Sequence, residues 1–365
     1  MTQIYGLTTK ELEQFCVQNG FKSFCSKQIF GWLYCKYADT FAQMSNISKA
    51  LQNMLELEFT LSNLELAKVE RSKDGTKKYL FKTVDNFTFE AVFLKMKDAK
   101  FNDDGKKIAG EKYTFCISSQ IGCRVGCTFC LTAKGGFVRN LSAAEIVEQV
   151  VFLKKDNDID AKKSVNIVFM GMGEPLLNLE NVSKAIKIMS DKNGLDIAPR
   201  RQTISTSGIA PKIHKLGTLD LGVQLAISLH APEDDLRSKI MPINKRYNLK
   251  SLMDAVLSFP LESRKRVMFE YLLLDGVNDS ITHAKGLLRL LNGIKVKVNL
   301  ILFNPYPDSL YNRPSDANAT KFADYLNGHG LLATIRESKG IDISAACGQL
   351  IEKQLDNNCS TWNIK

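Results

Sequence analysis

The feature that most limits the fold is a regular alternation of strand-like and helix-like segments that begins near residue 111. Strand candidates lie at 113–118, 165–170, 202–207, 222–229, 267–273 and 296–303, with a late one at 331–336, and several of them are nearly continuous apolar runs. Helical patterns separate them, for example 143–153, where Ser142-x-x-Glu145 forms a capping box. Strands that are apolar along nearly their whole length are typical of parallel sheets buried on both faces. The pattern predicts an α/β fold with a partial parallel (β/α)6 barrel over residues 111–350.

The segments outside this alternation follow other patterns. Residues 1–65 have helical spacing, with Thr8 or Thr9 as the expected N-cap, and predict a small helical accessory domain. Residues 66–110 predict a β-hairpin extension, with strands near 78–81 and 88–94 around a turn at 84–86, followed by a polar loop at 95–112. Residues 351–365 are expected to form a C-terminal tail.

The formal net charge of +10 favours a polyanionic partner, of which nucleic acid is the common one. A basic surface that only aids solubility is the alternative. The first residues lack the basic and apolar regions of a secretory signal, and no apolar run is long enough to span a bilayer. We therefore expect a cytoplasmic protein with no membrane association.

The nine cysteines do not resemble a disulfide framework, because their number is odd and no export signal is evident. Four of them are scattered and are expected to be inert thiols: Cys16, Cys25, Cys35 and Cys359.

Three other cysteines, Cys123, Cys127 and Cys130, are close enough together to bind one metal centre. Gly122 and Gly126 give the backbone freedom to wrap around it. A structural zinc ion needs four protein ligands, and neither a second CxxC nor a histidine pair is present. Three thiolates instead suit a [4Fe–4S] cluster with one iron open to another ligand.

Polar or glycine residues follow several predicted strands at their C-terminal ends, where barrel enzymes bind their ligands. The residues that we expect to bind a cofactor there are Gly173, Glu174, Ser205, Ser228, Leu229, His230 and Asn304. Each could instead be an ordinary turn or strand-end cap. Their shared position at one end of the barrel favours a common pocket.

Two remaining cysteines, Cys116 and Cys347, are buried thiols on the simplest interpretation. The chain, however, resembles the RlmN/Cfr family of radical-SAM RNA adenine methyltransferases over essentially its whole length. The motifs that carry the resemblance are 116–123, 135–141, 170–178, 205–208, 228–232, 304–307 and 345–350.

This resemblance implies a radical-SAM barrel in which Cys123, Cys127 and Cys130 bind one [4Fe–4S] cluster, whose open iron holds S-adenosylmethionine. Two molecules of S-adenosylmethionine would be consumed per methylation. Cys347 would become S-methylcysteine, and its methyl group, after losing a hydrogen atom to a 5′-deoxyadenosyl radical, would add to the base. Cys116 would form a transient disulfide with Cys347, and Glu90 would accept the proton from the base. A solvated strand carboxylate is the alternative for Glu90.

The implied substrates are adenosines in 23S rRNA and in tRNA next to the anticodon, methylated at C2. The resemblance also implies a low-potential electron donor such as flavodoxin or ferredoxin, and we expect a monomer. Two alternatives stay open: methylation at C8, as in Cfr, and a zinc-stabilised RNA-binding module without catalysis. Basic pairs or runs that could contact phosphates lie at 77–78, 200–201, 245–246 and 264–266.

Overall fold

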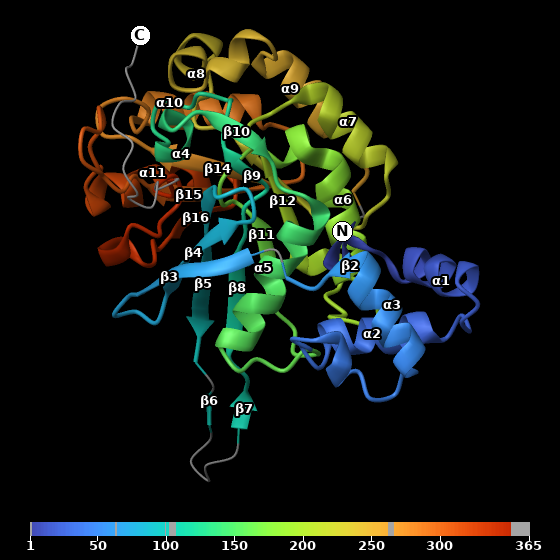
Figure 1. Ribbon diagram of the computed structural model, residues 1–365. Coiled ribbons are helices and arrows are strands. Elements are labelled where there is room, and N and C mark those ends of the chain that lie inside the picture. Colours follow the sequence, from blue (N-terminus) through green and yellow to red (C-terminus); the bar gives the residue numbers. More distant parts are fainter. Residues whose placement is uncertain (1, 63, 99, 102–106, 262–265, 352–365) are drawn as a thin grey trace.

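The computed structural model describes residues 2–62, 64–98, 100–101, 107–261 and 266–351. Its centre is a ten-stranded sheet in the order β16-β15-β14-β13-β12-β11-β8-β5-β4-β3 (Figure 1). Seven strands of this sheet, from β8 through β11 to β16, pair with one another in parallel. They are β8 (Lys112–Cys116), β11 (Asn166–Phe169), β12 (Gln202–Thr206), β13 (Gln224–Ser228), β14 (Val267–Leu273), β15 (Val296–Leu302) and β16 (Ala333–Arg336). The predicted α/β fold with a parallel partial barrel is confirmed, including the late strand.

Helices cover the outer face of the parallel strands (Figure 1). They are α5 (Ala143–Asp156), α6 (Leu179–Met189), α7 (Ala210–Thr218), α8 (Asp234–Ile240), α9 (Leu249–Leu257), α10 (Ile281–Leu290) and α11 (Asp316–Gly328). Helix α5 begins at the predicted capping box: Ser142 Oγ accepts from the Glu145 N–H, and the Glu145 carboxylate accepts from the Ser142 N–H.

The hairpin continues the barrel sheet. β3 (Leu64–Arg71), β4 (Lys77–Thr83) and β5 (Thr88–Lys97) are antiparallel, and β5 pairs with β8 so that Val92 lies opposite Cys116. The prediction of a polar loop at 95–112 is wrong in part. β5 extends to Lys97, and β6 (Lys100–Phe101) and β7 (Lys107–Ala109) form a small ribbon. Strands of two or three residues contain too few alternations for a periodicity argument to detect.

The N-terminal region contains α1 (Thr9–Gln18), α2 (Cys25–Tyr34) and α3 (Lys49–Glu58), together with the short parallel pair β1 (Thr2–Gln3) and β2 (Phe59–Thr60). Thr8 is the N-cap of α1, in a capping box with Glu11. The buried residues Leu12, Phe30 and Leu51 belong to the same apolar core as the barrel. Within the described ranges, no helix has the length and apolarity needed to cross a membrane.

The remaining elements shape the loop that carries the three clustered cysteines. β9 (Gln120–Gly122) pairs with β10 (Phe137–Asn140), and α4 (Leu131–Lys134) lies between them. Single turns of 3-10 helix lie at Ile4–Gly6, Phe41–Gln43, Pro175–Asn178, Pro199–Arg201, Pro242–Lys245 and Ile341–Ile343.

Candidate active site

Two cavities occupy the inside of the barrel. The upper cavity lies at the C-terminal ends of the parallel strands, and the lower cavity lies near their N-terminal ends. The predicted residues that line the upper cavity are Cys123, Cys127, Cys130, Gly173, Glu174, Ser205, Ser228, His230 and Cys347. Five residues line both cavities: Met170, Glu270, Ile301, Cys347 and Leu350. The barrel therefore has one chamber above and one below, with Cys347 between them.

The cysteine loop is anchored where β9 pairs with β10. The Cys123 N–H donates to the Gly136 carbonyl at 2.6 Å. Gly122 has a φ of +70°, and a Cβ there would lie 2.0 Å from the same carbonyl oxygen, so only glycine fits. The loop then turns back through the Cys130 N–H, which donates to the Cys127 carbonyl at 3.1 Å, and enters α4. Local hydrogen bonds thus direct the three thiols to one cavity wall.

The surroundings of these thiols suit a cationic centre. Burial raises the pKa of Cys123 to about 12 and raises the pKa values of Cys127 and Cys130 as well. Buried thiols become thiolates only where a positive group compensates them, and iron does so. Each cysteine of a [4Fe–4S] cluster binds its own iron, so the three sulfurs do not have to meet at a single ion. The residues present therefore fit such a cluster.

Glu174 is held rigidly beside this wall. Gly173 has a φ of +100°, and a Cβ on it would lie 2.5 Å from Gln120 Cβ. Gln120 Oε1 accepts from the Glu174 N–H at 2.8 Å. The Glu174 carboxylate accepts from the Ser207 N–H and O–H, both at 2.7 Å, and from the Leu176 N–H at 3.1 Å. Burial raises the pKa of Glu174, and the bonds from Ser207 act in the opposite direction. Both oxygens are thus fixed in place.

His230 is a neutral side chain of defined tautomer. Its Nδ1 accepts from the Leu272 N–H at 3.0 Å, which leaves the ring proton on Nε2. Burial, with the nearby Arg237 cation, lowers the pKa of His230 to about 3. Its φ is +59°, and the Asn278 amide holds its carbonyl at 2.8 Å. His230 can therefore donate one hydrogen bond within the upper cavity.

Two predicted cofactor residues are not among the described residues that line either cavity. Leu229 is fully buried, and its N–H donates to the Glu270 carbonyl at 3.0 Å. The Asn304 amide donates to Ser338 Oγ at 2.8 Å, and the Asn304 carbonyl accepts from Gln349 at 3.3 Å. Leu229 therefore binds the backbone of the neighbouring strand, and Asn304 binds the side chains of Ser338 and Gln349.

Cys347 lies in a C-terminal segment that packs on the cysteine loop. The Leu131 N–H donates to the Gly348 carbonyl at 2.7 Å, and Thr132 Oγ1 donates to the Leu350 carbonyl at 2.5 Å. The Cys347 side chain is exposed to the space of both cavities inside the barrel. Burial, together with the charge of Glu270, raises the pKa of Cys347 to about 11.

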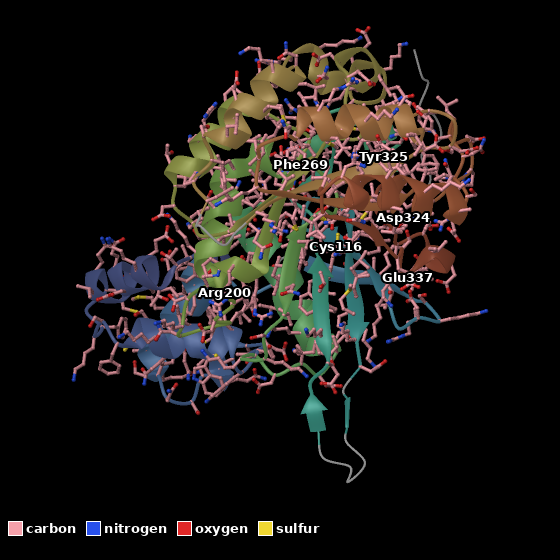
Figure 2. All side chains as sticks on the ribbon, turned by 180° about the vertical axis from the view of Figure 1, so that it is seen from behind. Cys116, Arg200, Phe269, Asp324, Tyr325 and Glu337 are labelled. Carbon is pink, nitrogen blue, oxygen red and sulfur yellow. The ribbon has the colours of Figure 1, made fainter. Side chains whose placement is uncertain are left out.

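Cys116 ends β8 and lines the lower cavity. Burial raises the pKa of Cys116, and the charge of Cys347 raises it further. Figure 2 shows Cys116 between Arg200 and Glu337, two further residues of the same cavity wall. Both thiols are free, and both line the lower cavity.

Glu90 is buried, so the alternative of a solvated carboxylate is wrong. Its Oε1 pairs with Lys78 Nζ at 3.2 Å, and its Oε2 accepts from the Ile351 N–H at 3.0 Å. It lies two residues from Val92, the partner of Cys116 in the β5–β8 pair. Glu90 therefore holds the end of the segment that carries Cys347.

The predicted basic pairs separate into different environments. Arg200 and Arg201 line the lower cavity, as do Arg336 and Lys339. Lys78 is buried against Glu70 and Glu90, so it is not available to a phosphate. The exposed residues elsewhere are Lys245, Arg246 and Arg266, whereas 264–265, like Cys359 and the tail from 352, lie outside the described residues.

Sequence reasoning missed two buried charged residues of the site. Arg237 donates to the Leu229, Ser207 and Ser228 carbonyls at 2.7–3.0 Å and so joins two strand ends. Glu270 lines both cavities. A carboxylate within the apolar strand Val267–Leu273 was the available signal for Glu270.

Comparison with known proteins identifies the family. A model described as "Ribosomal RNA large subunit methyltransferase N-terminal domain" matches residues 2–61, and one for the radical SAM superfamily matches 117–285. A dual-specificity RNA methyltransferase RlmN of Campylobacter lari is 60% identical, over 95% of this chain and 96% of its own. The chain belongs to the RlmN family. The RlmN protein of Helicobacter hepaticus is 57% identical over 98% of this chain and 96% of its own.

A crystal structure of a radical SAM methyltransferase from Sphaerobacter thermophilus has the same fold as this RlmN-family chain. The TM-score is 0.86 at 40% identity, over 96% of this chain and 99% of that one. Radical-SAM enzymes use S-adenosylmethionine and a [4Fe–4S] cluster, and the three thiols of the upper cavity fit that requirement.

Proposed function

We propose that the protein methylates C2 of adenosine in 23S rRNA and in tRNA next to the anticodon. The observation that carries this proposal is the position of Cys347. Its thiol opens above to the wall of Cys123, Cys127 and Cys130, and below to the chamber that contains Cys116. A carbon unit on the Cys347 sulfur could therefore be loaded and activated from above and delivered below.

In the upper cavity, Cys123, Cys127 and Cys130 would hold the [4Fe–4S] cluster, and a low-potential donor such as flavodoxin or ferredoxin would reduce it. The reduced cluster with bound S-adenosylmethionine supplies a 5′-deoxyadenosyl radical. Glu174, Ser205, Ser228 and the Nε2–H of His230 provide polar groups along the cavity wall for S-adenosylmethionine. Gly173, which has no side chain, lets that ligand approach the backbone.

The two isolated thiols would perform the transfer. Cys347 takes a methyl group from a first S-adenosylmethionine and gives up a hydrogen atom from that methyl when a second is cleaved, so two are consumed per methylation. The carbon would add to the base, and the radical adduct would lose its C2 proton to Glu90 and one electron to an acceptor such as the oxidised cluster. Cys116 would then attack the Cys347 sulfur to form a disulfide, and the Cys116 thiol proton would end on the released methyl group. Support for this step comes from the lower cavity, which both thiols line.

Glu90 would accept the C2 proton. Its burial beside Lys78 keeps a compensated carboxylate near Cys116, on the same face of the sheet. The bond from the Ile351 N–H couples this carboxylate to the Cys347 segment, so the base is placed relative to the thiol that carries the carbon.

The target nucleotide would enter the lower cavity. Its wall carries Arg200, Arg201, Arg336 and Lys339, which can pair with the phosphates beside an unstacked base. The net charge of +10 adds a general attraction for RNA.

The decisive experiment is anaerobic turnover on both RNAs, followed by mass and NMR identification of the modified nucleoside. We expect 2-methyladenosine from each RNA; 8-methyladenosine as the sole product would overturn the C2 assignment. A colourless protein containing zinc and no iron would overturn the radical chemistry altogether.

Two variants test the roles of the thiols. Cys347→Ala should abolish methylation while it keeps iron and sulfide. Cys116→Ala should accumulate a covalent protein–RNA adduct, because the carbon stays bonded to both sulfur and base. Free product from the Cys116 variant would contradict the disulfide step.

A further inference from the structure

Glu270 is the ionisable side chain that accompanies Cys347 in both cavities. The other three described residues that line both cavities, Met170, Ile301 and Leu350, have side chains that do not ionise. Glu270 lies in the middle of β14, and its side chain is buried. A carboxylate in this position requires an explanation, because burial of a charge without a strong partner is costly.

The partners of Glu270 leave it only partly compensated. Glu270 Oε1 accepts a hydrogen bond from the Asn299 amide of β15 at 2.8 Å. Among the described residues, the carboxylate has this one hydrogen-bond donor. The charged groups that influence it are Lys297 of β15 and Arg336 of β16, and the Cys347 thiol of the C-terminal segment lies in the same two cavities. The other charged residues of the lower cavity are Arg200, Arg201, Glu337 and Lys339. Burial raises the pKa of Glu270. The hydrogen bond from Asn299 opposes that rise most, followed by the charges of Arg336 and Lys297. Glu270 can therefore gain a proton at little cost.

The proposed function requires a proton acceptor beside Cys347. When the Cys347 sulfur takes a methyl group from S-adenosylmethionine, its S–H bond breaks and an S–C bond forms. S-adenosylhomocysteine leaves as a neutral thioether, so one proton must be removed. With a pKa of about 11, the thiol is almost entirely protonated at neutral pH.

We propose that Glu270 accepts the proton of the Cys347 thiol as the sulfur is methylated. The inference rests on the proposed function and adds a residue to its first step. The negative charge of Glu270 disfavours the thiolate only while Glu270 is ionised, so transfer of the thiol proton to Glu270 removes that penalty. The lower cavity, which Glu270 also lines, then gives the proton a route to water.

Glu337 lines only the lower cavity, away from the wall where S-adenosylmethionine would bind, and the other candidates for this role are engaged. Both oxygens of Glu174 accept bonds from Ser207 and Leu176. His230 has its Nδ1 occupied by a backbone N–H and carries its proton on Nε2. Glu90 pairs with Lys78 and lines neither cavity among the described residues.

The test measures methylation of Cys347 directly, without RNA. Cluster-free protein is reconstituted with iron and sulfide, mixed with isotopically labelled S-adenosylmethionine, and the peptide containing Cys347 is followed by mass spectrometry. We expect Glu270→Gln to methylate Cys347 roughly 10²–10⁴-fold more slowly at neutral pH, the usual contribution of a positioned base. Glu270→Asp, which keeps the carboxylate, should recover part of that rate.

The pH profile separates this role from a structural one. In Glu270→Gln the rate should rise about tenfold per pH unit towards the pKa of the thiol, because only the thiolate reacts. The wild-type rate should rise less steeply. Iron content and S-adenosylmethionine binding should be unchanged in the variant.

The outcomes are distinguishable. If the wild-type protein leaves Cys347 unmethylated, the proposed function fails. If the wild type is methylated and Glu270→Gln matches its rate and pH profile, Glu270 is not the acceptor and this inference alone is overturned. A variant that loses iron or S-adenosylmethionine binding along with the rate would also contradict it, since Glu270 would then be structural.

Discussion

Replacing Gly122 by alanine tests whether the β9–β10 pair positions the first thiol of the cluster. Gly122 has a φ of +70°, and a Cβ there would lie 2.0 Å from the Gly136 carbonyl oxygen, whereas real Cβ atoms stay beyond 3.0 Å. The strands must therefore separate by about 1 Å, the difference between these values. The Cys123 N–H, which donates to that carbonyl at 2.6 Å, would lose its bond.

The size of the effect follows from two contributions. A left-handed conformation costs a residue with a side chain about 1–2 kcal/mol. The lost hydrogen bond costs about 0.5–1.5 kcal/mol. We expect the free energy of unfolding to fall by roughly 1.5–3.5 kcal/mol, and the displaced Cys123 to reduce cluster binding.

Gly136→Ala is the matched control. Gly136 also has a positive φ, +74°, but a Cβ there would meet nothing within 4 Å. It should lose only about 1–2 kcal/mol and keep its cluster. Denaturant unfolding and iron and sulfide content after anaerobic reconstitution measure both effects. If the two variants match in stability and iron content, the steric reasoning is refuted.

Three further predictions follow from charged side chains. Glu174→Gln removes the charge that accepts from Ser207, so the free energy of unfolding should fall by about 1–3 kcal/mol in denaturant titrations; no change would show that these bonds are unimportant. The hydrogen-bonded ion pair with Arg139 lowers the pKa of Asp85 to about 2 from 3.8. Its stabilisation should therefore be complete above pH 3.8 and disappear as the pH falls through 2, and the stability difference from Asp85→Asn, measured across that range, should shrink accordingly; a constant difference would contradict this. Arg200→Gln should weaken RNA binding and reduce the salt slope by about 1, whereas the exposed Lys245→Gln serves as control; equal slopes for the two variants would argue against RNA entry by the lower cavity.

The sequence alone determined the features that depend on local spacing. Cys123, Cys127 and Cys130 lie within one loop, so any fold that closes the loop brings them together. The strand–helix alternation predicted each parallel strand, and in several of them, such as β14, burial on both faces leaves an apolar run that is visible without tertiary structure. The capping box at Ser142 is likewise complete within four residues.

Tertiary structure decided which distant side chains share a chamber. Cys116 and Cys347 come together because the C-terminal segment folds back onto α4 and the cysteine loop. Glu270 became a candidate only once its strand placed it in both cavities with Cys347, whereas Leu229 is buried and is not among the described residues that line either cavity. Such assignments depend on strand register and on contacts between residues far apart in the chain, and local spacing contains neither.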